Sequence, residues 1–373
     1  MKKKFYGLIA VCIAVFAIYY AYDSHIIGGP SENGSPYKFY YGELDKTEKR
    51  AYDCVLDDIY DMPQKIRVPY LTGDQLDNVF MALLYDNPDL FFLGRKCSVT
   101  SGFLTDYFSV DYIMDKQEYR REARELENIK KKVIDSLSDP SDEWQTELEI
   151  HDYIIDHCDY KIKEKDYSYS SSYGALVNKK AACEGYSKAA KLLLDEVGIE
   201  NGIVCGKATS QKNETSSHMW NAVKINGKFY HVDCTWDDPV NDNGMKMRMY
   251  SYFNVSDEMI DVSHTDFSYD FNCFSDEENY YIKKGLYFTS FGTAEKKILK
   301  EKTAECVKNG EKYVQIRFAS RKLYKSAVSN LIKNGEIYNI LTDVKKSTGK
   351  KISTDMMRYY ENEMQNILTI IVE

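Results

Sequence analysis

The sequence lacks the short motifs that most readily reveal a metal or nucleotide site. It contains no HExxH pair, no CxxC pair, no EF-hand loop, no Walker loop and no GxGxxG turn. It also lacks an excess of positive charge, because its formal net charge is −9, whereas a nucleic-acid partner requires a basic face. These absences predict a protein with no metal, no nucleotide or other cofactor, and no nucleic-acid partner.

The cysteines form no framework that would indicate a disulfide-stapled protein. There are nine of them, and they are scattered along the chain without close pairs. An exported protein can form disulfides, and one or two bridges are compatible with this sequence, although the sequence does not assign their pairing. We expect most of these cysteines to be buried thiols that pack as small apolar side chains.

Residues 1–24 predict export. Three lysines at positions 2–4 precede an apolar run over residues 5–22, which is typical of a segment inserted with its N-terminus inside. The run is about long enough to span a membrane as a tilted helix. No A-x-A cleavage pattern follows it, which favours an uncleaved membrane anchor; a cleaved signal peptide and a lipidated Cys12 are the alternatives. The rest of the chain is therefore expected at the cell surface, membrane-anchored or secreted.

Composition and turn signals divide the remainder into four parts, and no internal repeat is present. Residues 25–36 are rich in Gly, Ser and Pro and are expected to form a tether. A mixed α/β N-terminal domain is expected over residues 37–140, and a central domain over residues 141–260. A small C-terminal α+β region is expected over residues 261–373. The expected fold class of the chain is α+β.

Apolar periodicity predicts the individual elements around the central domain. Helices are predicted over residues 44–60, 73–85, 118–137, 143–158 and 322–333, and strands over residues 90–93, 107–113, 280–289 and 313–318. Residues 356–360 and 366–372 are expected to form a terminal hairpin. The biased stretch at residues 167–173 is expected to be a mobile loop.

An amphipathic helix is expected to begin at Cys183. Apolar side chains recur at helical spacing from Tyr186 to Val197, and Gly198 supplies the stop. The first turn of a helix offers orphan N–H groups and the positive end of the helix dipole, which favour a negatively charged sulfur. The thiolate is the reactive form of cysteine, and the backbone N–H of Cys183 can donate to a developing oxyanion. Alone, the pattern fits a buried structural cysteine better than a nucleophile.

A β-hairpin is expected downstream of this helix. Asn226-Gly227 separates two strand-like runs, residues 218–225 and 228–234, and this dipeptide is a strong signal for a two-residue turn. Such a turn fixes the register of the two strands, so that Ala222 is expected to oppose His231.

This register places a histidine beside a carboxylate. Trp220 is expected to oppose Asp233, which makes Asp233 a same-face diagonal neighbour of His218, close enough for hydrogen bonding. In such a pair the imidazole takes the proton of a thiol, while the carboxylate fixes the imidazole tautomer. Cys183, His218 and Asp233 are therefore candidate catalytic residues, and Trp220 is a candidate for binding substrate.

The other histidines are expected to be structural. His231 lies farther along the same face of the hairpin and has no acidic partner in the predicted register. His264 lies near the end of the central domain and has no motif around it. Asp237 and Asp238, just before a proline, are expected to form a turn rather than a cation site.

The same residues closely resemble those of bacterial transglutaminase-like proteins. The resemblance lies in CEGYSKAAKLLL at Cys183, HMWNAVKINGKFYHVDCTWDDP at His218 and YFNVSDE at Tyr252, and it extends over about residues 143–260. It implies a papain-like transglutaminase core, in which a helix bearing cysteine packs against a sheet bearing histidine and aspartate. It also implies that Cys183, His218 and Asp233 form a catalytic triad that acts through a thioester, in a transglutaminase-like catalytic domain.

The resemblance leaves the outcome of the reaction open. Water as acceptor would make the protein a cysteine peptidase or amidase, and an amine would make it a cross-linking transglutaminase. We favour hydrolysis, because water outnumbers any amine unless a second-substrate site excludes it. A non-catalytic surface module is the alternative of another class, and the intact triad argues against it. The expected partner is a peptide or protein, including cell-wall or surface proteins within reach of the anchor.

Overall fold

The computed structural model describes residues 31–372 except 104, 164–165, 240–245 and 353–356. The predicted anchor or signal peptide and residues 25–30 of the tether therefore lie outside the described residues. Within the part that is described, no helix is both long enough and apolar enough to cross a membrane. The chain divides into two units, Met1–Ile203 and Val204–Glu373, and each is described by itself. The domain boundaries expected from the sequence stay predictions.

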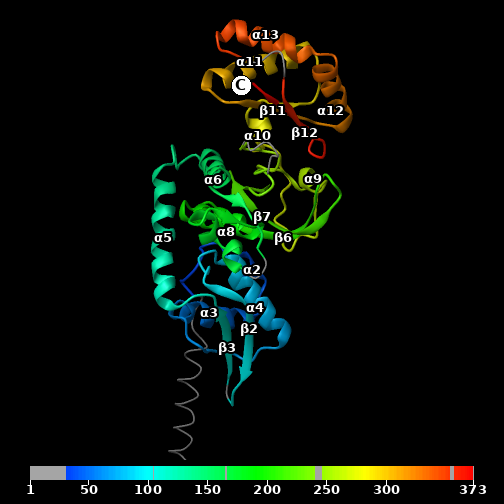
Figure 1. The fold of residues 1–373 in the computed structure, drawn as a ribbon. Helices are drawn as coiled ribbons and strands as arrows, with labels where there is room; N and C mark the ends of the chain where they lie inside the picture. The colour runs from blue at the N-terminus through cyan, green and yellow to red at the C-terminus, as the bar shows by residue number, and fades with distance from the viewer. Residues whose placement is uncertain (1–30, 104, 164–165, 240–245, 353–356, 373) are drawn as a thin grey trace, which may run out of the picture. The chain divides into compact units, whose positions relative to one another are not determined.

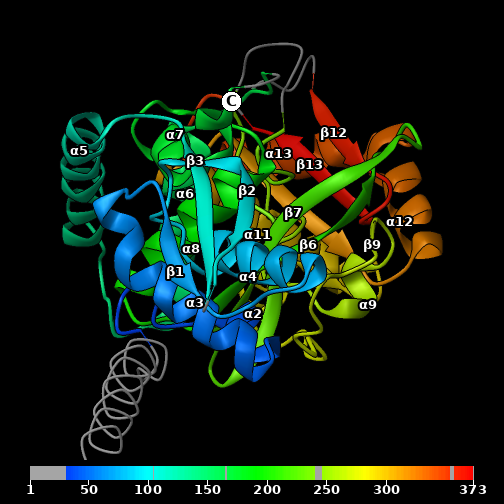
Figure 2. The same cartoon turned by 90° about the horizontal axis from the view of Figure 1, so that it is seen from below.

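The first unit begins with three helices and a small antiparallel sheet (Figure 1). The helices are α2 (Phe39–Glu43), α3 (Lys46–Asp58) and α4 (Gly73–Asp86), and the strands are β1 (Ile66–Val68), β2 (Leu93–Ser101) and β3 (Asp106–Tyr112), in the order β1-β3-β2. Figure 2 shows β2 and β3 side by side in this sheet. Capping boxes at Asp45 and Thr72 begin α3 and α4, because each side chain accepts from backbone N–H groups left unpaired in the first turn.

The rest of the first unit is mostly helical. It contains α5 (Lys116–Asp135), α6 (Glu143–His157), the 3₁₀-helix η2 (Tyr167–Ser170), α7 (Ser172–Leu176) and α8 (Cys183–Glu196), with β4 (Asp159–Tyr160) pairing in parallel with β5 (Lys180–Ala181). The prediction of a mobile loop at residues 167–173 is wrong. Ser171 caps α7 by accepting from the backbone N–H of Gly174 at 2.9 Å, and α7 is buried along its whole length.

The hairpin of the second unit has the predicted register. Its sheet has the order β8-β7-β6-β9, formed by β8 (Lys228–Val232), β7 (Thr215–Ile225), β6 (Asn201–Thr209) and β9 (His264–Thr265). Ala222 opposes His231, and Asn226 and Gly227 both have positive φ angles, as the predicted turn type requires. The strand ends one step early, however, because the backbone N–H of Asp233 donates to the carbonyl of Tyr252. The predicted pairing of Trp220 with Asp233 is therefore not made.

The C-terminal part of the second unit is a sheet with helices. Its strands are β10 (Tyr287–Phe288), β11 (Tyr313–Phe318), β12 (Tyr359–Asn362) and β13 (Ile367–Ile371), in the order β10-β11-β13-β12. Its helices are α9 (Asp257–Ile260), α10 (Tyr280–Lys283), α11 (Thr293–Asn309), α12 (Arg321–Val328) with the π-helix Ser329–Lys333, and α13 (Glu336–Thr348). The terminal hairpin is confirmed. Of the strand expected at residues 280–289, only the two residues of β10 form, because Asn279 caps α10 before it.

The arrangement confirms the α+β class expected from the sequence. Both units contain sheets together with helices, and the pairings of β7 with β8 and of β6 with β9 near the site are antiparallel. The eight described cysteines are free thiols, so none of the bridges compatible with the sequence is present among them.

Candidate active site

The centre of the site in the second unit is a buried pair formed by His218 and Asp233. His218 lies on β7, and Asp233 directly follows β8. Nε2 of His218 is 2.6 Å from Oδ2 of Asp233. The other carboxylate oxygen, Oδ1, accepts from the backbone N–H groups of Thr235 and Trp236 at 2.9 and 3.1 Å. The Asp233 side chain is 0% exposed, so hydrogen bonds replace the water that a buried carboxylate loses.

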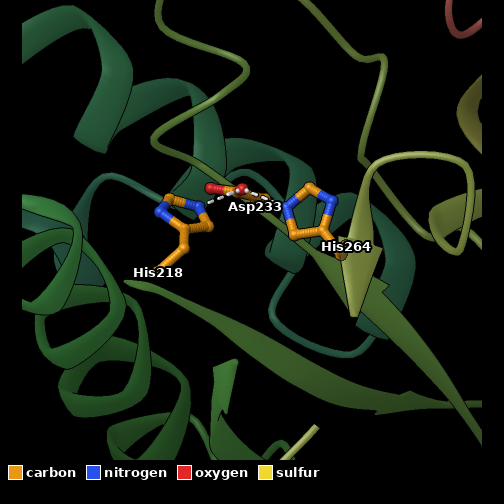
Figure 3. A group of neighbouring side chains, drawn as sticks. All are labelled: His218, Asp233 and His264. Atoms are coloured by element: carbon orange, nitrogen blue, oxygen red, sulfur yellow. Dashed lines mark hydrogen bonds and ion pairs between the residues drawn. The ribbon is translucent and has the colours of Figure 1, made fainter. Parts of the chain in front are cut away.

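A second imidazole, that of His264, contacts the same carboxylate. Its Nε2 lies 3.1 Å from Oδ2 of Asp233, and Figure 3 shows the two rings pointing at the carboxylate from opposite sides. The sequence has no motif around His264, so this contact with Asp233 was not predicted. Its local sequence carries no signal, because β9 brings it into place only by pairing with β6.

The Asp233 carboxylate carries the negative charge of this cluster. Burial by itself would raise the pKa of Asp233, but attraction to His218 and hydrogen bonds from both imidazoles hold that pKa well below its usual range. Burial lowers the pKa of His264, against the opposing effect of Asp233. His264 is thus a neutral ring that donates from Nε2. When His218 also donates from Nε2, its Nδ1 is the nitrogen left to accept a proton.

Two tryptophans fix the ring of His218. The Trp220 ring lies parallel to it, with centroids 6.0 Å apart and planes at 19°. The Trp236 ring lies 5.6 Å away at a tilt of 45°. Trp220 is only 1% exposed, so its ring offers no surface to a substrate. The prediction that Trp220 binds substrate does not agree with this burial, and its packing gives it a positioning role.

His231 does have an acidic partner, which comes from outside the hairpin and was not predicted. Its Nε2 lies 2.8 Å from Oδ1 of Asp257, at the start of α9. Its Nδ1 lies 3.0 Å from the indole Nε1 of Trp220, which can only donate. The Nδ1 atom must therefore accept, and the proton of neutral His231 sits on Nε2. This pair anchors Trp220, which in turn packs on His218.

Among the residues that the structure describes, two groups contain donor atoms that could hold a metal ion: His218, Asp233 and His264, and His231, Asp257 and Cys273. In the second group, the proton on Nε2 of His231 occupies the position that a metal would need, and burial raises the pKa of Cys273. In the first group, a metal would have to replace both imidazole hydrogen bonds to Asp233. The hydrogen bonding therefore favours two hydrogen-bonded imidazole–carboxylate groups over metal centres.

The candidate nucleophile is the first residue of α8, as the sequence predicts. Cys183 is half-buried, and its position gives it the electrostatic environment of a helix N-terminus. Gly185 in the same turn is required by packing, since a Cβ there would lie 2.7 Å from the Tyr169 carbonyl oxygen. Beside the cysteine, the buried Glu184 carboxylate pairs with Arg95 and Lys188. Burial would raise the Glu184 pKa, but these two cations lower it overall.

Cys183 belongs to the first unit, and His218 and Asp233 belong to the second. The expectation that the sulfur of Cys183 lies beside the His218 ring stays a prediction.

Comparison with known families bears on the same residues. The family model of the transglutaminase-like superfamily matches residues 127–234, a range that includes Cys183, His218 and Asp233. Residues 127–234 form a transglutaminase-like domain. Membership of this superfamily is consistent with cysteine peptidase or transglutaminase activity.

Two solved structures resemble the chain that carries the transglutaminase-like domain. One is a crystal structure of a TGase, with 15% identity and a TM-score of 0.29, covering 54% of this chain and 57% of that one. The other is a proposed cysteine protease from Cytophaga hutchinsonii, with 12% identity and a TM-score of 0.26, covering 42% of this chain and 66% of that one. The chain thus spans less than two thirds of either relative. No curated protein matches it.

The buried neutral His264 predicts that the second unit loses stability in mild acid. Its pKa is lowered from 6.5 by burial, so below that value the unfolded chain binds a proton that the folded chain does not. The stabilising contribution is complete above 6.5 and is lost as the pH falls toward the folded-state pKa. We expect the free energy of unfolding to be lower at about pH 5.5 than at about pH 8.

Urea unfolding followed by tryptophan fluorescence measures this effect, because Trp220 and Trp236 both pack against His264. His264→Phe keeps an aromatic ring in place but removes the titration, and it should flatten the pH dependence. His157→Phe, at an exposed position on α6, is the control and should keep the wild-type slope. An unchanged slope in His264→Phe would show that His264 does not titrate as described.

Proposed function

We propose that the protein is a thiol acyltransferase that acts on peptide or protein amides, with Cys183 as nucleophile. The observation that carries the proposal is the buried pair of His218 and Asp233, 2.6 Å apart and held further by His264. Burying ionisable groups costs free energy, so a protein core contains few such clusters unless they serve a function. The position of Cys183 at the first turn of α8 gives independent support.

The reaction begins when Nδ1 of His218 takes the proton of the Cys183 thiol. The thiolate attacks the carbonyl carbon of the amide, and the backbone N–H of Cys183 donates to the resulting oxyanion. His218 then gives its proton to the leaving amine, and a thioester remains on the sulfur. In the second half, His218 removes a proton from water, and the water oxygen attacks the thioester carbonyl. The C–S bond then breaks, the carboxylic acid is released, and His218 returns its proton to the sulfur of Cys183. Asp233 stays ionised throughout, because its pKa lies well below its usual range, and it stabilises the imidazolium.

We further propose that hydrolysis, rather than cross-linking, is the main outcome. A peptide substrate and a primary amine incubated with the purified chain should give mainly the free acid, since water is in large excess over the amine. Mass spectrometry separates the acid from the amine adduct, and Cys183→Ala is the control for uncatalysed reaction. Predominance of the amine adduct would make the protein a cross-linking transglutaminase instead.

A non-catalytic surface module that binds a protein or a glycan is the second candidate. It has the same fold and would use the same face of the sheet, but it does not need a nucleophile. This candidate predicts that Cys183→Ala leaves ligand binding unchanged and that neither protein turns over a peptide.

We also propose that the transglutaminase-like domain faces the outside of the cell. The support is the basic flank and apolar run of residues 2–22 in the sequence. Protease added to intact cells should then remove the domain, and lysed cells give the reference for full accessibility. A domain that is fully protected in intact cells would overturn this topology. Outside the cell, nearby wall or surface proteins are the substrates within reach.

A further inference from the structure

A cavity of about 290 Å³ in the second unit opens beside the Trp236 ring. The same ring contacts His218, with centroids 5.6 Å apart, and His264, with centroids 4.8 Å apart. Trp236 therefore separates the cavity from the candidate catalytic imidazole by the thickness of one side chain. A group bound in the cavity would lie against Trp236, which itself contacts His218.

The chemistry of the cavity wall is apolar and adaptable. Three methionines, Met247, Met249 and Met364, and the rings of Tyr252 and Tyr360 line it. Methionine side chains are flexible and polarisable, so they pack against groups of differing shape, and their sulfur atoms contact aromatic rings favourably. Such a wall fits an apolar or aromatic group better than a polar one.

The wall offers little to a charged group. Among its described lining residues, Glu361 is the only formal charge, and its Oε2 accepts a hydrogen bond from the Tyr324 hydroxyl at 2.6 Å. An acidic side chain in the cavity would meet no cation there and would meet the Glu361 carboxylate. Burying an unpaired charge costs free energy, so the cavity should reject acidic side chains most strongly.

The cavity is held open by the C-terminal sheet. Side chains at alternate positions of β11 share one face and bond to the segment that carries Met249. The Tyr313 hydroxyl accepts from the backbone N–H of Arg248 at 2.8 Å, and Gln315 donates to the carbonyl of Arg248 at 2.8 Å. Arg317 donates to the carbonyl of Ser251 at 3.3 Å. Gln315 and Arg317 are buried, so these bonds fix the wall.

The opposite wall is the turn of the β12–β13 hairpin, which carries Met364. Asn362 of this hairpin accepts from the side chain of Gln211, beyond the end of β6, at 3.2 Å. Its amide also donates to the hydroxyl of Ser251 at 3.4 Å. The hairpin is thus tied to two separate segments around the cavity.

We propose that this cavity binds one uncharged apolar or aromatic side chain of the peptide substrate, close to the amide that is attacked. The inference rests on the proposed function and deepens it, because it names the substrate class. The volume lies at the lower end of the range for small-molecule pockets, which suits one large side chain rather than several residues. The C-terminal α+β region then has a defined role, since its hairpin supplies a wall of the specificity pocket.

The test measures peptide binding by calorimetry to the full chain carrying Cys183→Ala, so that no turnover is needed. The probes are neutral peptides of Ala, Gly and Ser that carry one Phe at successive positions, together with versions in which Asp or Ala replaces the Phe. At one position the Phe peptide should bind roughly 10- to 100-fold more tightly than the Asp or Ala peptide, the range expected for burying a large apolar side chain. Equal binding of Phe, Asp and Ala at every position would overturn the proposal.

A variant that fills the cavity tests whether the Phe side chain binds there. Met364→Trp adds volume to the wall and should remove most of the preference for Phe. Glu363→Trp places the same side chain on the same turn, at an exposed position outside the cavity, and should keep the preference. If Met364→Trp keeps it as well, the Phe binds elsewhere and the proposal is wrong. A Phe preference without turnover in the wild type would refute the catalytic proposal alone, whereas turnover without any preference would refute the cavity proposal alone.

Discussion

Cys183→Ala is expected to lower kcat/KM for a peptide amide by about 10⁴–10⁶-fold, the range for removal of a triad nucleophile. The reason is that alanine offers no atom to form the thioester, while His218 and Asp233 remain in place. Little volume is removed from a half-buried position at the start of α8, so the fold should persist. Release of the amine product from a fluorogenic peptide measures the loss, and circular dichroism checks folding.

The matched control is Cys97→Ala. Cys97 is also half-buried and lies in the first unit, on β2, but it has no place in the proposed reaction. Its variant should retain wild-type kcat/KM within a few-fold. Wild-type turnover by purified Cys183→Ala would refute the enzyme proposal and leave the binding module as the better account.

Asp233→Asn is expected to lower kcat by about 10⁴-fold, less than His218→Ala does. The asparagine oxygen can still accept from the backbone N–H groups of Thr235 and Trp236. Its NH₂ group must then face Nε2 of His218, which favours the tautomer that carries the proton on Nδ1. That is the nitrogen that has to accept the thiol proton, so the base is blocked although the packing is kept.

Asp257→Asn is the control for this change. It alters the same kind of imidazole–carboxylate contact, since Asp257 lies 2.8 Å from His231. Here the asparagine oxygen can still accept from the Nε2–H of His231, so the hydrogen bonds that anchor Trp220 are kept and the tautomer of His218 is not affected. We expect its kcat to stay within a few-fold of the wild type. Comparable losses in the two variants would mean that the site responds to general disturbance of the sheet and not to the tautomer of His218.

Features set by local sequence could be predicted. The start of α8 at Cys183 follows from the spacing of apolar residues and from Gly198. The register of β7 and β8 follows from Asn226-Gly227, whose positive φ angles few other residues adopt readily. The contact of His218 with Asp233 was within reach of the same reasoning, even though Asp233 lies beyond the end of its strand.

Features set by distant segments could not be predicted. His264 reaches Asp233 across 31 residues of sequence, through a two-residue strand that has no periodicity to read. Asp257 reaches His231 from α9 in the same way. Alternation along β7 indicated the face on which Trp220 lies but not how deeply that face is covered. The aromatic run near Tyr280 has the composition of a strand, yet the side chain of Asn279 begins a helix there.

The most direct test of the account is the rate at which iodoacetamide alkylates Cys183 near neutral pH, followed by peptide mass mapping of the full chain. Cys97 is the internal reference, because its pKa is raised to about 11, mainly by burial and secondarily by the negative charge of Asp77. If His218 removes the thiol proton, Cys183 is alkylated much faster than Cys97, and His218→Ala slows Cys183 by about tenfold or more while Cys97 is unchanged. A Cys183 that reacts no faster than Cys97, or equally fast with and without His218, would contradict the claim that these residues form a catalytic site.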